Sequence, residues 1–272
     1  MALLQHCIRL IKLLARRSTE PVRCQTVVCR LYTGVEYDAL SYTWGNPPAD
    51  CPIDIDGRQT LVRKNLWRFL SQISTPGYDM PRLLWVDSIS IDQENAEERS
   101  EQVGMMGQIY SQARKVIIWL GPAYHGSDQA MEALTDCLGL VSYKKKHAKF
   151  WSSARGLALS RLCNRLYWTR LWVLQEVMLA NEITVICGGK QAEWSAFCKI
   201  MAAVDTETPR GIQGHRDISE RNLDAFCMEM TAIGGAPAGH SKRNGDVQAI
   251  LYSPGMAMVR HFRSQAVLEV GL

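Results

Sequence analysis

The stretch Leu83–Pro122, LLWVDSISIDQENAEERSEQVGMMGQIYSQARKVIIWLGP, decides the fold class. It begins with a short apolar run, LLWV, which is typical of a strand buried on both faces. A polar loop follows, and then a segment whose apolar residues recur at helical spacing from Val103 to Ala113. A second apolar run, KVIIWLGP, predicts another buried strand that stops at a Gly-Pro pair. The stretch therefore predicts a βαβ unit with two parallel strands.

The loop inside this unit is the first pointer to a site. Asp87 comes directly after the first buried strand, and Asp92 and Gln93 follow it closely. Asn95 and Glu98 then form an Asn-x-x-Glu pair, which predicts a capping box at the start of the helix. Open parallel sheets bind ligands at the carboxyl ends of their strands. We therefore expect residues 87–93 to lie at a binding edge of the sheet.

Strand-like segments precede the unit, and one of them is ambiguous. The pattern predicts strands at 22–31 and 37–44, a hairpin at 53–62, and either an edge strand or a short helix at 8–14. The hairpin turns on Asp56-Gly57, a dipeptide that favours a two-residue turn. Asn65 is expected to be the N-cap of the next helix.

Helical patterns dominate the chain after the unit. They predict helices at 128–140, 157–180 and 194–204, a loop at 143–153 and a strand at 183–187. From residue 205 the apolar residues are sparse, which predicts an irregular, poorly packed or partly disordered C-terminal tail. The expectation is an α/β domain over residues 1–204, with a mainly parallel sheet flanked by helices, an N-terminal β-hairpin elaboration, and a tail over 205–272.

Composition narrows the class of partner. The 272 residues are 47% hydrophobic and 21% charged, as in ordinary globular proteins, and the net charge is only +4. That charge is too small to indicate binding to nucleic acid or to an anionic membrane. Polar residues interrupt every long apolar run, so none approaches the roughly 20 residues of a spanning helix. We expect a protein without a membrane span that works in the cytoplasm.

The cysteines and histidines indicate neither disulfides nor a metal. The nine cysteines are scattered, with no Cys-x-x-Cys pair, which is typical of buried thiols in a reducing compartment. The six histidines form no His-Glu-x-x-His motif, so no zinc site is expected. Neither a Walker motif nor Gly-x-Gly-x-x-Gly occurs, which argues against a phosphate-binding loop.

Three blocks in order resemble the fungal heterokaryon-incompatibility (HET) domain. They are YDALSYTWG at 37–45, the Leu83–Pro122 stretch, and WTRLWVLQE at 168–176 followed by Cys187-Gly188. The resemblance runs from about residue 8 to about residue 204. It implies a role in non-self recognition that ends in programmed cell death. The family usually has Cys where this chain has Ser90, so the resemblance transfers no thiol chemistry to that position.

HET domains in turn look like distant relatives of TIR domains, which cleave NAD or act as adaptors. Trp172 to Glu176 is similar to the Trp-x-x-x-Glu of TIR domains, in which the Glu is catalytic. This resemblance implies a TIR or flavodoxin-like fold of three layers. It also implies that Glu176 is the catalytic residue of an NAD glycohydrolase, with NAD as substrate and no further cofactor.

Two interpretations of Glu176 remain open at this level. Its helix is apolar almost all round, so the carboxylate should be buried and must be paired or hydrogen-bonded. As a catalytic group it would stabilise the oxocarbenium-like state of N-glycosidic cleavage. As a structural group it would pair with Arg165 or Arg170 and fix the position of the helix.

The other predicted site residues would bind the substrate. They are Asp87, Trp44, Trp172, Gln93 and Ser41. Asp87 is expected to hold ribose hydroxyls, whereas Asp92 more simply caps the following helix. Trp44 or Trp172 would present a π-face to the nicotinamide cation. Ser41 lacks a Gly-x-Ser-x-Gly elbow, which excludes a hydrolase nucleophile of that type.

Two function classes follow. In the first, the domain depletes NAD enzymatically and the cell dies as a consequence. In the second, it is a non-enzymatic signalling or adaptor module that self-associates or recruits a partner signalling protein, and Glu176 is structural.

Overall fold

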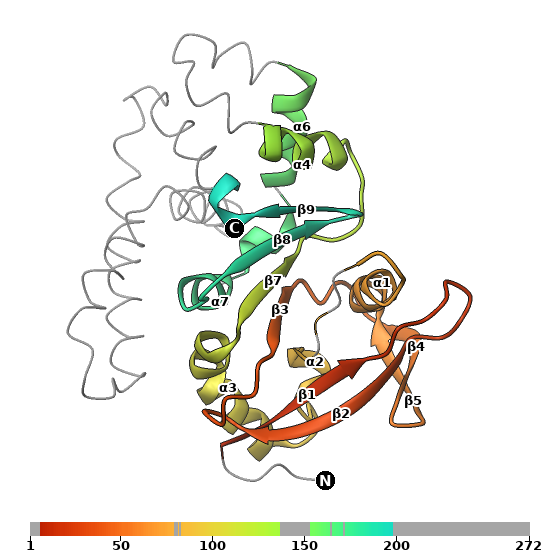
Figure 1. Cartoon of the computed structure of the whole chain (residues 1–272), viewed down its shortest axis with the longest axis vertical. Coiled ribbons are helices and arrows are strands. Elements are labelled where there is room, and N and C mark those ends of the chain that lie inside the picture. Colours follow the sequence, from red (N-terminus) through yellow and green to blue (C-terminus); the bar gives the residue numbers. More distant parts are fainter. Residues whose placement is uncertain are drawn as a thin grey trace, which may run out of the picture. The chain divides into compact units, whose positions relative to one another are not determined.

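The computed structural model describes residues 6–78, 81, 83–136, 153–163, 165–170 and 172–197 (Figure 1). The chain divides into two compact units, residues 1–128 with 172–191, and residues 129–171 with 192–272. The predicted tail and most of the predicted 143–153 loop lie outside the described residues. The domain boundaries at 204 and 205 therefore stay a prediction.

A mixed sheet organises the first unit. Its strand order is β5-β4-β2-β1-β6-β3-β7-β8-β9. The strands are β1 (Cys7–Leu13), β2 (Arg23–Arg30), β3 (Asp38–Tyr42), β4 (Ala49–Ile55), β5 (Arg58–Arg63), β6 (Leu84–Trp85), β7 (Lys115–Trp119), β8 (Ile183–Cys187) and β9 (Lys190–Glu193).

Strand direction divides the sheet into two parts. β6 and β7 both pair in parallel with β3, and β7 pairs in parallel with β8, so the predicted parallel βαβ unit is confirmed. β1 pairs antiparallel with both β2 and β6, β4 pairs antiparallel with β5, and β2 joins β4 in parallel. The α/β class and the flanking helices are confirmed, but the sheet is mixed rather than mainly parallel. The TIR or flavodoxin-like three-layer arrangement is accordingly not confirmed.

A two-residue turn explains the antiparallel β4–β5 pair. The β4–β5 hairpin turns on Asp56 and Gly57, whose φ angles of 53° and 77° suit a primed two-residue turn. The Asp54 carboxylate accepts a hydrogen bond from the Gly57 N–H at 2.8 Å, and Asp56 accepts one from the Thr26 N–H at 3.0 Å. Hydrogen bonding to Thr26 holds the pKa of the Asp56 carboxyl below its ordinary value. The predicted hairpin is confirmed.

The ambiguous 8–14 segment is the strand β1, and it lies inside the sheet rather than at its edge. It pairs with β2 along its whole length and with β6 on the other side. Ile8, Leu10 and Ile11 are fully buried. Apolar residues of β1 are buried on both faces of the sheet, with Lys12 the exposed exception, so the pattern lacks the polar alternation of an edge strand.

One face of the sheet is covered by α1 (Lys64–Ile73). Its buried residues Leu66, Phe69, Leu70 and Ile73 share a core with Leu40, Tyr42 and Trp119 from β3 and β7. The predicted Asn65 N-cap is wrong, because Arg63 occupies the N-cap where β5 runs directly into the helix. Asn65 instead donates to the Thr43 carbonyl at 2.6 Å and accepts from the Trp119 indole N–H at 3.0 Å. It satisfies a buried indole group rather than the helix terminus.

The other face is packed by α3 (Ala96–Gln112). Tyr110 of α3 meets Trp85 of β6 edge-on, with ring centroids 5.6 Å apart, and its hydroxyl donates to the Leu40 carbonyl at 3.2 Å. Of the capping box predicted for Asn95 and Glu98, only the bonds accepted by Asn95 are confirmed. The Asn95 side chain accepts from the N–H groups of Glu97 and Glu98.

Glu98 does not complete the predicted capping box. Its buried carboxylate accepts the Asp92 N–H at 2.8 Å and forms an ion pair with Arg9 at 3.0 Å. Because a buried charge needs a partner, the Arg9 guanidinium takes precedence over the Asn95 N–H. Arg9 also donates to the Ser90 carbonyl at 2.8 Å. This group ties the loop before α3 to β1.

The single long helix predicted at 157–180 is wrong. The segment forms α6 (Ala154–Cys163), the 3₁₀ turn η2 (Leu166–Thr169) and α7 (Val173–Met178). Arg165 and Arg170 interrupt it with extended backbone, at ψ angles of 146° and 132°. Periodicity alone did not signal these breaks, because both residues have good helix propensity.

The second unit contains an aromatic cluster. Trp168 lies 4.8 Å from Tyr167, 6.1 Å from Trp194 and 6.0 Å from Phe197, measured between ring centroids. The helix predicted to begin at Trp194 does begin there and is described to residue 197. α4 (Ser127–Asp136) begins one residue before its predicted start.

The described cysteines are free thiols. They are Cys7, Cys24, Cys29, Cys51, Cys163 and Cys187. Burial raises the pKa of Cys163 to about 12. Burial, with the charges of Asp54 and Asp56, also raises the pKa of Cys24 to about 12. Both thiols are therefore poor nucleophiles near neutral pH.

Candidate functional site

Three of the predicted site residues come together beyond the carboxyl end of β3. The Trp44 indole N–H donates to one Asp87 carboxylate oxygen at 2.7 Å, and the Ser88 N–H donates to the other at 2.7 Å. The Gln93 amide donates to the Asp87 carbonyl at 2.9 Å. Asp87 is the first residue of the short helix α2 (Asp87–Ser90), and its carboxylate holds both the Ser88 N–H and the Trp44 indole.

Two contacts at this cluster were not predicted. The Tyr42 hydroxyl and the Ser88 hydroxyl are hydrogen-bonded at 2.6 Å. The Arg63 guanidinium lies over the Trp44 ring, 5.3 Å from its centroid, and donates to the Gly45 carbonyl at 2.8 Å. Arg63 ends a different strand, so local spacing contained no signal for this contact. The π-face of Trp44 is thus already partnered by a cation.

A groove of about 960 Å³ adjoins the cluster. Trp44, Gln93 and Asp92 line it, together with residues of β1, β2, β4 and β5. Asp92 is exposed and accepts a hydrogen bond from the Glu94 N–H at 3.2 Å, within the loop before α3. Asn95 is the N-cap of α3, so the prediction that Asp92 caps this helix is wrong. The volume is in the range of small-molecule pockets.

Ser41 and Glu176 form a separate group. The Ser41 hydroxyl donates to the Glu176 carboxylate, and both residues are fully buried. Glu176 lies in the first turn of α7 and does not line the groove. Ser41 and Tyr42 are consecutive residues of β3, so their side chains point to opposite faces of the sheet. The predicted residues are therefore divided between two faces, with Asp87 on the face of Tyr42 and Glu176 on the other.

The position of α7 is set by close contact with α3. A Cβ atom added at Gly107 would lie 2.8 Å from the Gln175 amide nitrogen and 3.3 Å from a Leu179 methyl. Trp172 is the N-cap residue of α7, is 48% exposed and does not line the groove. Arg165 and Arg170 belong to the second unit, so their predicted pairing with Glu176 stays a prediction.

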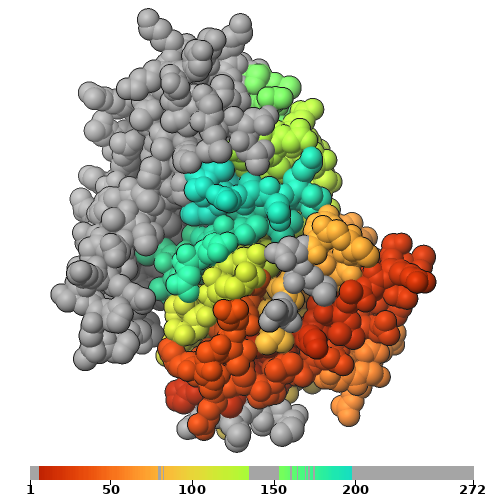
Figure 2. Space-filling model, viewed as in Figure 1, coloured from red at the N-terminus to blue at the C-terminus, as the bar shows by residue number. Residues whose placement is uncertain are grey.

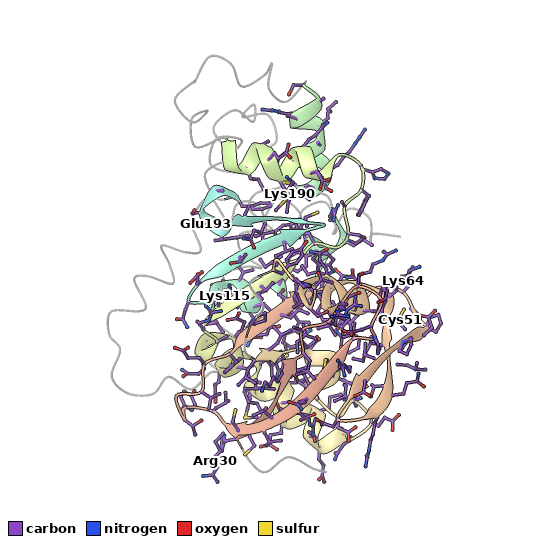
Figure 3. The ribbon with its side chains drawn as sticks, turned by 45° about the vertical axis from the view of Figure 1, so that its right-hand side comes forward. Arg30, Cys51, Lys64, Lys115, Lys190 and Glu193 are labelled. Atoms are coloured by element: carbon purple, nitrogen blue, oxygen red, sulfur yellow. The ribbon has the colours of Figure 1, made fainter. Side chains whose placement is uncertain are left out.

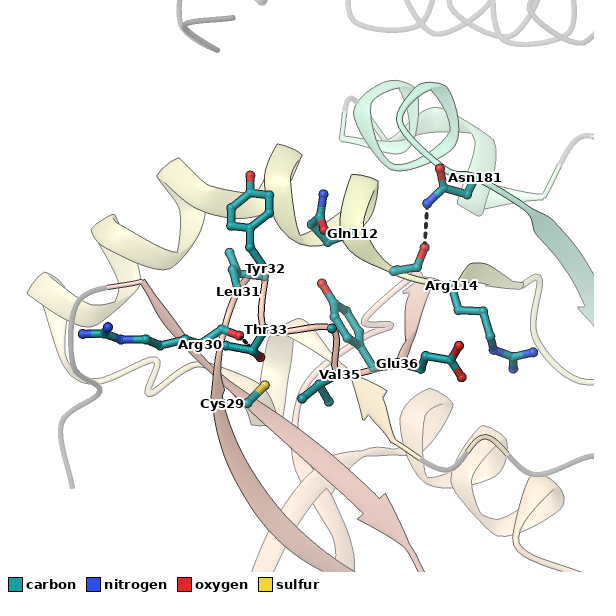
Figure 4. Close-up of a pocket in the computed structure, with 13 residues that line it drawn as sticks. Cys29, Arg30, Leu31, Tyr32, Thr33, Val35, Glu36, Gln112, Arg114 and Asn181 are labelled. Atoms are coloured by element: carbon teal, nitrogen blue, oxygen red, sulfur yellow. Dashed lines mark hydrogen bonds between the residues drawn. The ribbon is translucent and has the colours of Figure 1, made fainter. Parts of the chain in front are cut away.

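A smaller hollow of about 240 Å³ lies at the amino end of β3 (Figure 4). The Asn181 amide donates to the Ala113 carbonyl at 2.9 Å, and Arg114 forms an ion pair with the buried Asp38 at 2.8 Å. The first contact fixes the turn before β8 to the end of α3, and the second fixes the residue before β7 to the start of β3. Parallel sheets bind ligands at the opposite, carboxyl edge, so we assign no site here.

The described residues contain no group of three or more His, Cys, Asp and Glu side chains that could hold a metal ion. Within the same ranges, every helix is too short or too polar to cross a membrane.

The chain belongs to the heterokaryon incompatibility protein (HET) family, whose sequence model matches residues 37–176. This range contains both the Trp44–Asp87 cluster and the Ser41–Glu176 pair.

Among curated proteins, the chain is similar to "Heterokaryon incompatibility protein 6, OR allele" of Neurospora crassa. The two are 28% identical over 219 residues, which covers 62% of this chain and 32% of the relative. The chain thus spans about a third of the length of that relative. No solved structure matches the chain.

Proposed function

We propose that the chain acts in heterokaryon incompatibility as a non-enzymatic signalling module that leads to programmed cell death. Membership of the HET family and similarity to a Neurospora incompatibility protein support the role. In this proposal the module works inside the cell through contacts with a second copy or with a partner signalling protein.

The observation that carries the non-enzymatic assignment is the burial of Glu176. Its exposed fraction is 0%, and Ser41, itself fully buried, donates to its carboxylate. A catalytic carboxylate must come within hydrogen-bond reach of the substrate. Glu176 has no accessible surface through which it could reach a ribose, so we assign it to holding α7 against β3.

NAD cleavage is the second candidate, and one feature favours it. Ser41 lies near the carboxyl end of β3, which is one of the parallel strands β6, β3, β7 and β8, and it donates to Glu176 of α7. Nucleotides bind at this edge in open α/β sheets. The Trp172–Glu176 segment also has the spacing of the TIR Trp-x-x-x-Glu motif. A displacement of α7 would be required to expose the carboxylate.

Overexpression of Glu176→Gln in a filamentous fungus tests the proposal. Glutamine retains an oxygen that can accept the Ser41 hydrogen bond but cannot stabilise an oxocarbenium ion by charge. We therefore expect the folded variant to reduce colony viability as strongly as the wild-type chain. Glu182→Gln is the matched control, because Glu182 is exposed.

Loss of killing by Glu176→Gln, at wild-type protein levels and with a cooperative unfolding transition that shows the variant is folded, would contradict the non-enzymatic assignment. Killing by Glu182→Gln in the same strain would show that the loss is specific to the buried position.

A further inference from the structure

The strand β5 is an open edge of the sheet. It is last in the strand order and, in the described part of the chain, pairs only with β4. Arg58, Gln59 and Leu61 are exposed, and Leu61 retains 56% of its surface. Figure 2 shows the hairpin, in orange, at the surface of the molecule. Unpaired N–H and C=O groups on such an edge can pair with another extended chain.

The 960 Å³ groove is lined in part by residues of β5 and has several apolar residues in its wall. Ile55, Leu61 and Ile89 line it, as does Val28, which is 56% exposed. An added strand would place alternate side chains toward the groove, since successive residues point to opposite faces. The groove therefore offers apolar pockets to a chain that pairs with β5.

The strand β5 contains two charged residues, and both are arginines. Arg58 begins the strand and Arg63 ends it, and neither forms an ion pair with a carboxylate in the described ranges. Arg9, the third arginine of the groove, is neutralised by Glu98. Of the five N–H donors of Arg63, the bond to Gly45 uses one.

The acidic residues of the groove are not part of β5. Asp56 lies at the hairpin turn, where its carboxylate accepts the Thr26 N–H, and the charge of Arg58 acts on it more weakly than that hydrogen bonding does. Asp92 follows α2 and accepts the Glu94 N–H. Lys64, the residue after β5, adds a further positive charge beside Cys51 of β4 (Figure 3). The edge itself is thus basic at both ends.

We propose that β5 is a docking edge for an extended acidic segment of a partner protein. The segment would pair antiparallel with β5, place one carboxylate opposite Arg63 and another opposite Arg58, and present apolar residues between them. Cross-strand pairs of opposite charge stabilise such pairing, whereas like charges destabilise it. A second copy of β5 is disfavoured, because antiparallel pairing would put Arg58 of one copy opposite Arg63 of the other.

A six-residue peptide, Glu-Val-Val-Thr-Gln-Glu with blocked ends, matches this register and serves as the probe. Its binding to the whole purified chain is measured by fluorescence anisotropy at low salt, beside the peptide Lys-Val-Val-Thr-Gln-Lys. We expect the acidic peptide to bind about tenfold more tightly, since two exposed ion pairs replace two like-charge contacts. The double variant R58E/R63E should reverse this preference.

The matched control is the double variant R30E/K190E, which makes the same change in net charge at two exposed residues outside the groove. It should keep the wild-type preference for the acidic peptide. Equal affinity of the wild-type chain for both peptides would overturn the proposal. So would an equal loss of acidic-peptide binding in both double variants, or a dimer that R58E/R63E dissociates. None of these results bears on NAD cleavage, so failure here is distinct from failure of the proposed function.

Discussion

Replacing Glu176 with alanine is expected to lower the free energy of unfolding by about 3 kcal/mol. The substitution removes the carboxylate that accepts the Ser41 hydroxyl and leaves a cavity between α7 and β3. A buried hydrogen bond to a charged group contributes about 1.5–3 kcal/mol, and the cavity adds to the loss. Urea unfolding followed by tryptophan fluorescence measures the change.

Glu176→Gln and Ser41→Ala separate the hydrogen bond from the cavity. Glutamine fills the same space and keeps an acceptor, so its effect should be about 1 kcal/mol. The double variant Ser41→Ala with Glu176→Ala should lose less stability than the two single variants lose in sum. The reason is that each single substitution already removes the same Ser41–Glu176 hydrogen bond. Additive effects, or a Glu176→Ala variant as stable as wild type, would contradict an anchoring role for Glu176.

Replacing Gly188 with alanine should also destabilise the chain by about 3 kcal/mol. Gly188 has a φ of 53°, and an added Cβ would lie 2.6 Å from the Ala123 Cβ and 2.9 Å from the Ala123 backbone nitrogen. Neither contact can be relieved by rotating a flexible side chain. The Gly188 N–H also donates to the Gly121 carbonyl at 2.9 Å, which joins the ends of β7 and β8.

Gly189→Ala is the control for this substitution. Gly189 has no left-handed φ, and the nearest atom to its added Cβ is the Tyr78 hydroxyl oxygen at an ordinary 3.5 Å. We expect less than about 1 kcal/mol of change there. Similar stability of the two alanine variants in thermal unfolding would show that the approach of Gly188 to Ala123 is not tight.

The local elements of the fold were predictable because their signals are contained in short windows. The turn at Asp56-Gly57, the Asn95 cap and the boundaries of β8 depend on neighbouring residues only. The mixed character of the sheet was not predictable in this way. β1 enters the sheet between β2 and β6, and no local pattern encodes which strands become neighbours.

The candidate site could also be predicted only in part from local sequence signals. Trp44, Asp87 and Gln93 were expected together, and they do lie together. Ser41 was grouped with them, but the alternation of β3 turns it to the other face, where it bonds Glu176. Arg63 was missed because its contact with Trp44 crosses from β5 to the residues after β3. Pairings of this kind follow from tertiary packing.

Family membership and the buried Glu176 support different parts of the functional account. The HET match over residues 37–176 defines the family, whereas the burial of Glu176 supports our proposal of a non-enzymatic role. Asp87 is held by Trp44 and Ser88, so its carboxylate is engaged in the local structure. The groove beside β5 is then the accessible feature through which we expect a partner to act.

The most direct test of the central claim is release of nicotinamide from NAD by the purified chain, measured by chromatography. The chain is tested both as purified and after fusion to an oligomerising domain, because association could expose Glu176. A buried, anchoring Glu176 predicts release no faster than in the protein-free control. Release by the wild-type chain that disappears in the folded Glu176→Gln variant would contradict it.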